Sequence, residues 1–495
     1  MGLPVKVILF LQKNIKKEVP IMSKKEIISA LVDRYQQDVI QVSDTVWGFA
    51  EAGMKEYKTA EFYTKFFEEK GFNVEVGMAD MPTAFVASWG EGKPIVGFLG
   101  EFDALPLLSQ EASCAVKKPI VEGDYGHGCG HNCLGAGAAG AALALRDYLK
   151  ENNLPGTVRF YGTPGEEYGS GKIYMARAGL FNDLDLCLTW HPSATNNVWA
   201  TSSLANISVM FTFTGVTAHA AGNPHLGRSA LDACELMNVS VNYLREHIIP
   251  EARVHYAYVN ASGIAPNVVH DKATIHYFIR APKMSQAQEI YARVQDIAEG
   301  AAKMTGTTHV VDLKEAIYDY LPNITLSKVM EKAMNEIGAP EFDEADYALA
   351  NEFRKSFNEG NLASVKANLA GLSLDTDLIG DEEVLHTRIL PYKPLNKAMS
   401  GSTDVGDASY CAPTAQCGVA TEVLGTPGHS WQITAMSKSS IAHKGTMVAA
   451  KVMALTAIMA MEDEELLKAA KAELVKSTGG QYVSAMPAHI KPNIG

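Results

Sequence analysis

The stretch TVRFYGTPGEE, residues 157–167, is an apolar run that leads into a sharp turn carrying two carboxylates. LDLCLTWHP, residues 184–192, repeats this design and places a histidine after the apolar run. A third run, PIVGFLGEFDAL at 94–105, ends in acidic residues, and a helical pattern covers LGAGAAGAALALRDYLK at 134–150. Strands that alternate with helices predict an α/β sheet that binds ligands at its strand ends.

A different pattern begins after Leu204, where apolar and polar residues alternate as in half-exposed strands. Three stretches show this alternation: ANISVMFTFTG, VHYAYVNASG and KATIHYFIRAP, at residues 205–215, 254–263 and 272–282. Helical spacing over 229–245 and 285–305 completes a β-α-β-β-α order. This order predicts a small α+β open-faced sandwich inserted into the larger domain.

The chain has 495 residues, which is too long for one typical compact core, and we expect two domains. The larger domain is predicted at 1–204 together with 321–495, and the inserted domain at 205–320. Helical spacing also runs over 23–51, with Ser23 as its N-cap, whereas 340–399 is the least readable part of the chain.

The composition limits the classes of function. A net charge of −13 argues against nucleic acid as a partner, because phosphate neutralisation needs a basic face. Seven cysteines, an odd number over a long chain, predict no disulfide framework and favour a reducing compartment, the cytoplasm. The apolar run 5–11 is too short to span a bilayer and is interpreted as an N-terminal extension, with a poor secretion signal as the alternative. The run 447–461 is Ala-rich and contains Lys451, which predicts a buried core helix and no membrane partner.

The densest cluster of chemistry-bearing residues is GHGCGHNC at 126–133. A thiolate from Cys129 and an imidazole from His131 can reach one metal centre, and the glycines let the backbone and the ion approach closely. The alternatives are a glycine-rich turn with incidental histidines and a C-x-H-x-C structural zinc site, although one short loop cannot close a tetrahedral shell. A disulfide between Cys129 and Cys133 is not expected, because a helix begins between them.

The stretch GAGAAG at 135–140 has the form G-x-G-x-x-G of a dinucleotide-binding turn. That turn needs an apolar strand directly before it, and here the His/Cys turn precedes it. Close packing of a helix against the sheet is the better interpretation of these small residues.

Polar groups follow three more apolar runs. Glu166 and Glu167 point different ways, so one can bind a metal while the other holds the attacking water as general base; an exposed acidic turn is the alternative. His191 lies at the mouth of the next run, where the proline after it predicts a turn and a structural role is the alternative. His429 follows a further run, QCGVATEVLG. Four such sites suit two divalent ions, Zn or Mn, that share a hydroxide.

These motifs resemble the series found in M20 metallopeptidases. The resemblance rests on the HGCGHN, GEE, WHP and GHS motifs and on GSTDVGD at 401–407, and it covers the chain from about residue 25. It is closest to the amidohydrolase branch, which contains aminoacylase-like enzymes, auxin-conjugate hydrolases and aminobenzoyl-glutamate hydrolases. The resemblance implies a zinc-peptidase-like catalytic domain with Glu166 as general base and five metal ligands: Cys129, His131, Glu167, His191 and His429.

The resemblance also implies that the inserted sandwich is a lid that mediates dimerisation, in a homodimer or in a hetero-oligomer with a related subunit. His219 matches a family histidine that stabilises the oxyanion in a neighbouring subunit's active site, and Asn267 and Arg280 match contacts to the substrate carboxylate. The residues alone favour a turn histidine for His219 and a surface strand residue for Arg280. One departure is Asn132, where many relatives have an aspartate that orients the histidine before it; Asp103 is the candidate substitute.

Together the motifs predict a metal-dependent amidohydrolase that cleaves a small amide substrate, an N-acyl amino acid such as an aminobenzoyl-glutamate-like compound. A dipeptidase on the same scaffold and a metal-dependent binding protein without catalysis are the rival hypotheses. Retention of both Glu166 and Glu167 favours an enzyme, because a pure binding site needs no uncoordinated base.

Overall fold

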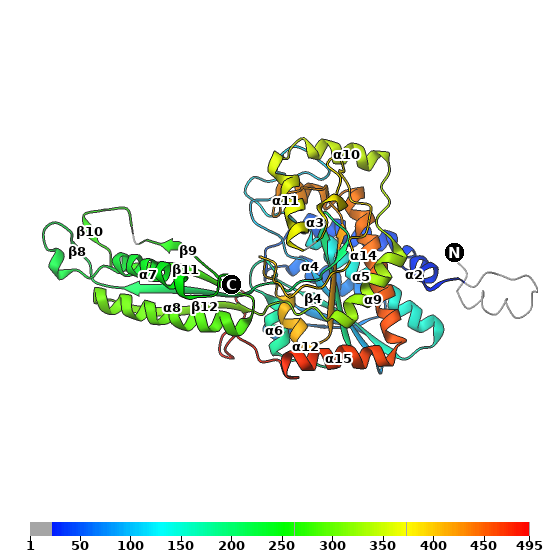
Figure 1. Cartoon of the computed structure of the whole chain (residues 1–495), viewed down its shortest axis with the longest axis horizontal. Helices are drawn as coiled ribbons and strands as arrows, with labels where there is room; N and C mark the ends of the chain where they lie inside the picture. The colour runs from blue at the N-terminus through cyan, green and yellow to red at the C-terminus, as the bar shows by residue number, and fades with distance from the viewer. Residues whose placement is uncertain (1–21, 262, 373, 495) are drawn as a thin grey trace, which may run out of the picture.

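The computed structural model describes residues 22–261, 263–372 and 374–494, and the expected N-terminal extension with its apolar run lies outside them. The chain forms a broad α/β body and a long arm that projects from one side of it (Figure 1). A seven-stranded sheet is the centre of the body, and a four-stranded sheet forms the arm. The predicted α/β domain with an inserted α+β sandwich is confirmed.

The central sheet has the strand order β1-β2-β4-β3-β5-β13-β6, and its inner strands β4, β3, β5 and β13 are parallel. The carboxyl ends of parallel strands lie at one edge of a sheet, where ligands bind. The strands are Asn73–Val76 (β1), Phe85–Glu91 (β2), Ile95–Glu101 (β3), Gly156–Thr163 (β4), Leu186–Ser193 (β5), Asn197–Val198 (β6) and Thr414–Ala420 (β13).

Helices cover both faces of this sheet. Alternate residues of a strand point to opposite faces, and in β3 Phe98 and Leu99 accordingly belong to two different hydrophobic clusters. Six helices pack in the larger cluster: Lys24–Asp33 (α2), Gln36–Phe49 (α3), Tyr57–Glu69 (α4), His131–Asn152 (α5), Ile324–Ile337 (α9) and Ser440–Met461 (α14). The smaller cluster includes Gly171–Arg177 (α6) and Val405–Cys411 (α12). Two further helices are Trp431–Met436 (α13) and Glu464–Thr478 (α15).

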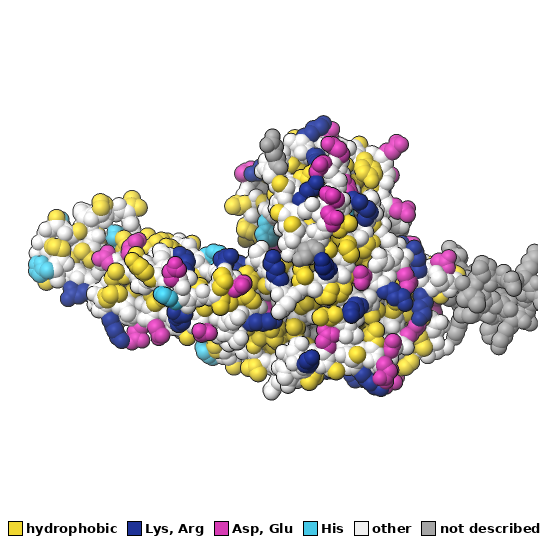
Figure 2. Space-filling view, viewed as in Figure 1, with side chains coloured by type: hydrophobic (Ala, Val, Ile, Leu, Met, Phe, Trp, Pro, Cys, Tyr) yellow, Lys and Arg dark blue, Asp and Glu magenta, His cyan; other side chains and the backbone are white. Residues whose placement is uncertain are grey.

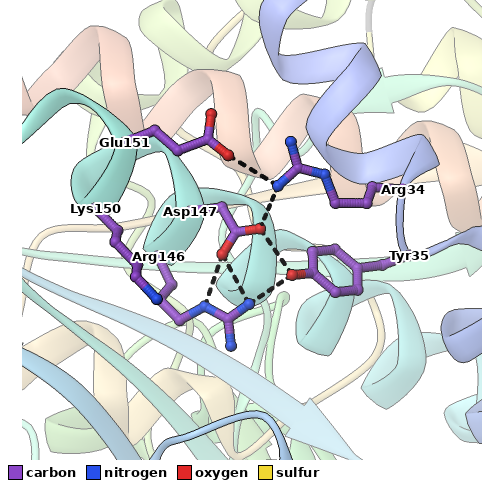
Figure 3. A pocket seen from close by; sticks show the side chains of 6 residues that line it. All are labelled: Arg34, Tyr35, Arg146, Asp147, Lys150 and Glu151. Atoms are coloured by element: carbon purple, nitrogen blue, oxygen red, sulfur yellow. Dashed lines mark hydrogen bonds and ion pairs between the residues drawn. The ribbon is translucent and has the colours of Figure 1, made fainter. Parts of the chain in front are cut away.

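The helical pattern predicted over 23–51 forms two helices rather than one. Ser23 caps α2 as predicted, but the helix breaks at Arg34 and Tyr35. Arg34 Nη1 and Tyr35 Oη both donate to the Asp147 carboxylate of α5, at 2.9 and 2.7 Å (Figure 3). The break turns these two side chains toward α5. Asp147 is 16 residues from His131, the first residue of α5. The hydrogen bonds to Asp147 therefore lie about 24 Å from the end of the helix that bears His131.

The small residues of α5 bring it close to its neighbours. A Cβ at Gly137 would lie 2.7 Å from Trp190 Nε1, and a Cβ at Gly140 would lie 2.8 Å from Val39 Cγ2. The G-x-G-x-x-G stretch is therefore a packing surface, as expected. Within the described residues, α14 alone is long and apolar enough to cross a membrane, and 72% of its apolar window is buried, as predicted for a core helix.

The arm has its own sheet, of order β12-β7-β11-β9, and its own hydrophobic cluster. That separate core supports the predicted boundaries near 204 and 321, which remain a prediction. The arm consists of Ala205–Thr214 (β7), Ala218–His219 (β8), Ala230–Leu244 (α7), Arg253–Asn260 (β9), Val268–Val269 (β10), Lys272–Ala281 (β11), Met284–Thr305 (α8) and Thr308–Ile317 (β12).

Strand β12 was not predicted. It is an edge strand in which apolar and polar residues alternate only over residues 311–314, and its register shifts between Leu313 and Glu315. So short a run of alternation is too little for a strand prediction that depends on periodicity.

The unreadable segment 340–399 contains Glu344–Arg354 (α10) and Glu359–Gly371 (α11). It packs in two small hydrophobic clusters, one containing Val423 and the other Leu424. Four short 3-10 helices complete the described part of the chain: Met78–Asp80, Pro224–Leu226, Arg245–His247 and Thr376–Leu378.

We predict that Gly137→Ala lowers the free energy of unfolding by about 1–3 kcal/mol, because the new methyl group overlaps the Trp190 ring. Alanine favours a helix over glycine by about 1 kcal/mol, so a loss would have to come from packing. Gly300→Ala in α8 is the matched control, since apart from its chain neighbours and its own helix backbone no atom lies within 4 Å of its Cβ position, and it should be neutral or stabilising. Urea unfolding measures both variants, and equal stabilisation of the two would contradict the packing argument.

Candidate metal centre

Neighbouring strand ends bring polar side chains to one edge of the central sheet. Glu101 is the last residue of β3, Glu166 and Glu167 follow β4, and His191 lies in β5. His429 is in the loop that follows β13 and has a left-handed backbone, with φ of 48°. The parallel order of these strands is what brings residues from distant parts of the chain together.

The turn predicted after His191 is wrong, because β5 continues through Pro192 to Ser193. β13 pairs with β5 along this stretch, whereas the pairing of β3 with β5 ends at Leu188. A proline has no N–H to donate and is tolerated where one flank of a strand has no partner.

Cys129 belongs to two groups of donor atoms that could each hold a metal ion, with the atoms of a group within 4.8 Å of one another. One group adds His131 and His191, and the other adds Glu167 and His429. Cys129 Sγ lies 3.5 Å from His191 Nε2, and His429 Nε2 lies 3.3 Å from Glu167 Oε1. The five residues predicted as ligands therefore converge, and Cys129 lies where the two groups meet.

Hydrogen bonds fix which nitrogen of each buried imidazole faces this pocket. His131 Nδ1 donates to Asp103 Oδ1 at 2.8 Å, and His191 Nδ1 donates to the carbonyl of Pro192 at 2.7 Å. In each ring the Nε2 lone pair then remains for a metal. Asp103 also accepts from the backbone N–H of Glu167 at 2.9 Å. The expected contact between Asp103 and His131 is confirmed.

The donor atoms fit a divalent cation. His131 Nε2 and Glu167 Oε1 are buried and make no hydrogen bond, which is uncommon for buried polar atoms. Burial raises the pKa of the Cys129 thiol, and a coordinated cation would remove its proton. Electron-pair donors that face one another out of water repel unless a proton or a cation lies between them. Thiolate, imidazole and carboxylate together suit a transition metal such as zinc.

Glu166 lies beside the five donors without being a member of their two groups. Its Oε2 is 4.0 Å from His131 Nε2. Burial raises the pKa of Glu166, and the negative charges of Glu101 and Glu167 raise it further. A carboxylate with a raised pKa is a stronger proton acceptor, which is the property a general base needs.

Two polar residues near Cys129, Asn132 in α5 and His127 before that helix, have structural roles. Asn132 points away from the donors, and its Nδ2 donates to Ser43 Oγ and to the Ser437 carbonyl, each at 3.0 Å. His127 Nε2 donates to the carbonyl of Val46 at 3.0 Å, and burial lowers the pKa of this histidine to about 4. The seven cysteines are all free, so the expectation of no disulfide at Cys129 is confirmed.

The structure does not bring His219 and Asn267 near the donors of the same chain. His219 is in β8 and Asn267 directly precedes β10, and both strands lie at the free end of the arm (Figure 1). Arg280 lies near the other end of β11, where its Nη1 is 3.2 Å from Ser402 Oγ. Lys272 and Arg280 are 8 residues apart in β11, or about 26 Å. Asn267 and Arg280 therefore do not share one carboxylate site within a chain.

Two buried residues of the centre were missed from the sequence. Glu101 Oε2 lies 3.4 Å from His131 Nε2, and Glu101 Oε1 lies 2.8 Å from Lys172 Nζ. Lys172 is completely buried and also contacts Asp404 at 2.6 Å. An acidic residue at the end of an apolar strand was the one available signal for Glu101, whereas nothing in the spacing indicated Lys172.

The strand ends of the α/β domain bring metal-type donors together beside the Glu166 carboxylate, and a lid is inserted next to them. This arrangement is suited to a metal-dependent amide hydrolase. The chain belongs to peptidase family M20/M25/M40, whose sequence profile matches residues 97–353. The predicted membership of this family is confirmed, and the protein is an amide-bond hydrolase.

Known relatives agree over most of the chain. A p-aminobenzoyl-glutamate hydrolase subunit of Escherichia coli is 42% identical over 94% of this chain and 98% of its own length. The Xaa-Arg dipeptidase of Mus musculus is 28% identical over 89% of this chain and 90% of its own. A dinuclear metal binding peptidase of the M20 family from Bacillus subtilis shares the fold, with a TM-score of 0.56, 17% identity and coverage of 87% and 99% of the two chains.

We predict that Asn132→Asp destabilises the protein by roughly 3 kcal/mol at pH 7, because a buried carboxylate would face the Ser437 carbonyl in place of a donor. The loss should shrink at acid pH, where that carboxyl group is protonated. Asn335→Asp on the exposed face of α9 is the control and should change little. Thermal unfolding as a function of pH gives the result, and an unchanged Asn132→Asp protein would contradict the assignment.

Proposed function

We propose that this protein is a two-metal amidohydrolase that releases an amino acid from an N-acyl amino acid, with aminobenzoyl-glutamate-like compounds as the first candidates. The observation that carries the proposal is Cys129, whose sulfur belongs to both donor groups while Glu166 remains beside them. The name of the Escherichia coli relative, 42% identical, supports the substrate class.

In the proposed mechanism, Cys129, His131 and His191 would hold one ion, and Cys129, Glu167 and His429 would hold the second. Two divalent ions, zinc or manganese, would polarise the amide carbonyl and lower the pKa of a water molecule toward neutrality.

Glu166 moves the proton. Its carboxylate accepts a proton from the attacking water, and the same oxygen then donates this proton to the amide nitrogen as the C–N bond breaks. The water oxygen becomes part of the carboxylate product, and the remaining water proton passes to the leaving amine, which departs as an ammonium group. Asp103 keeps His131 in the required tautomer, and Arg280 at the base of the lid offers a planar cation for the substrate carboxylate.

We further propose that the lid joins two subunits, because its outer surface exposes several apolar side chains. β9 is an edge strand with exposed Tyr256, Tyr258 and Val259, and α7 beside it exposes Val239 and Tyr243. Hydrophobic side chains are spread along the visible face of the arm (Figure 2). The partner is a second copy of this chain or a related protein, since the Escherichia coli relative is itself named as one subunit of a hydrolase. The free cysteines support a cytoplasmic location.

The His219 ring is suited to act in the partner subunit's site. His219 is exposed, and its Nδ1 accepts from the backbone N–H groups of Ala221 and Gly222 at 3.2 and 2.9 Å. The ring therefore carries its proton on Nε2, which points away from its own loop as a free donor for an oxyanion.

A hydrolysis screen tests the proposed function. Aminobenzoyl-glutamate, other N-acyl amino acids and dipeptides, the last including Xaa-Arg, would be incubated with the protein and Zn²⁺ or Mn²⁺. Release of glutamate from aminobenzoyl-glutamate supports the proposal, whereas cleavage of dipeptides alone would favour a dipeptidase. No hydrolysis by metal-loaded protein of any of them would overturn it.

Glu166→Gln should lower turnover by ~10²–10⁴-fold and leave the bound metal unchanged, because Glu166 is in neither of the two donor groups that contain Cys129. Metal analysis and the hydrolysis assay are made on the same sample. Loss of metal together with activity would make Glu166 a ligand, and full activity would remove it from the mechanism.

His219→Ala should lower turnover by ~10²–10³-fold with no change in unfolding, since the side chain is exposed. Co-expression with Glu166→Gln tests whether the residue acts between subunits. Half of the dimers are then mixed, and each has one intact site, so about a quarter of wild-type activity should return. No recovery in mixed dimers would place His219 outside the partner subunit's site.

A further inference from the structure

Glu101 reaches the metal centre from the end of β3, although the five-ligand set does not include it. Its Oε2 lies 3.4 Å from His131 Nε2, and Glu101, His131 and Glu166 form a third group of donors within 4.8 Å of one another. Both Glu101 and His131 are buried. Glu101 is therefore close enough to share an ion with the imidazole.

The contact between Glu101 and His131 is not an ordinary hydrogen bond. His131 already donates from Nδ1 to Asp103, and its Nε2 is buried without a hydrogen-bond partner. In the neutral imidazole that can bind a metal, the Nε2 lone pair and the carboxylate oxygen face one another. Two electron-pair donors directed at a common point out of water are stabilised by a cation between them.

Lys172 fixes the direction of the Glu101 carboxylate. Its Nζ contacts Glu101 Oε1 at 2.8 Å, which leaves Oε2 on the side of His131. Lys172 Nζ also contacts Asp404 Oδ1 at 2.6 Å, and its backbone N–H donates to Asp404 Oδ2 at 3.0 Å. The lysine and both carboxylates are buried, so the array cannot turn freely.

The charges of this array explain why a buried lysine is tolerated next to a cation site. Without a neighbouring carboxylate, the Lys172 ammonium group would repel a divalent ion held beside Glu101. Asp404 neutralises Lys172, and Glu101 then leaves one negative charge for the centre. The array holds a carboxylate in place while it keeps a net attraction for the ion.

We propose, on the basis of the metal centre described under the proposed function, that Glu101 is an additional ligand of the ion held by His131. Lys172 is its positioning residue, and Asp404 balances the charge of Lys172. Glu101 and Glu166 thereby have different tasks in the same donor group: Glu101 binds the ion, whereas Glu166 carries the proton.

Glu101→Gln is the sharpest test. Its amide oxygen can still accept from Lys172, and Lys172 and Asp404 remain a neutral pair, so the fold should be retained. The affinity of the metal-free protein for Zn²⁺, measured by competition with a chromophoric chelator, should fall at least about tenfold. Glu166→Gln is the control within the same donor group and should keep the wild-type affinity.

Three more variants separate the possible outcomes. Asp346→Asn alters a buried carboxylate that pairs with Lys444 elsewhere and should not affect the affinity. Glu101→Asp keeps the charge but withdraws the oxygen, so it should also weaken Zn²⁺ binding. This variant supplies the measurement if the glutamine variant fails to fold. Cys129→Ala must weaken binding strongly. If both Glu101 variants keep the wild-type affinity while Cys129→Ala binds weakly, Glu101 is not a ligand. If Cys129→Ala also keeps the wild-type affinity, the metal centre itself is refuted.

The positioning role of Lys172 has its own measurement. Lys172→Met should lower the Zn²⁺ affinity of the wild-type protein and have no further effect in the Glu101→Gln background. Additive losses in the double variant would mean that Lys172 acts independently of Glu101 and would overturn the positioning role. Thermal unfolding of the same proteins distinguishes this coupling from a general loss of stability.

Discussion

The repulsion among buried electron-pair donors is the constraint on which the rest of the structure depends. Cys129, His131 and His191 direct their donor atoms to within 4.8 Å of one another, and His131 Nε2 is buried without a hydrogen-bond partner. Such an arrangement is unfavourable by itself and becomes stable when a cation binds. The folding energy of the α/β body must therefore hold the donors in place, and the surrounding hydrogen bonds show how. Asp103 joins His131 to the backbone of Glu167, so the donors of two loops are tied through one carboxylate.

The position of α5 makes this possible. His131 is its first residue, and the glycines that follow let the helix lie against the sheet and against Trp190. The Trp190 indole N–H donates to the carbonyl of Leu134 at 2.9 Å, which holds the first turn of the helix to the strand that bears His191. Larger residues in this turn would move His131 away from His191. A sequence that resembles a nucleotide-binding loop is therefore part of the support of a metal site.

Much of the centre could be predicted from the sequence because strand ends are a local signal. An apolar run followed by Glu166 or His191 can be recognised within a dozen residues, and the parallel order of the strands brings such positions together. Lys172 and Asp404 are 232 residues apart, and a lysine in a short helix carries no sign of burial. The charged edge strand β12 and the small clusters around 340–399 were hidden for a similar reason, because tertiary packing and not periodicity determines them.

The shape of the lid bears on the assembly that the proposed mechanism needs. β7, β11 and β12 are 10 residues each, and they carry β8 and β10 to the end of the arm, away from the donors of their own chain. An exposed His219 with a fixed tautomer has no reacting group to contact there. Arg280, in contrast, is anchored at the base of the arm through Ser402. A catalytic site that uses both residues therefore needs two chains, with the base of one lid and the tip of another at the same centre. On the proposed mechanism, the apolar edge of β9 and the placement of His219 are two consequences of one requirement, because His219 can supply an oxyanion donor only when two subunits associate.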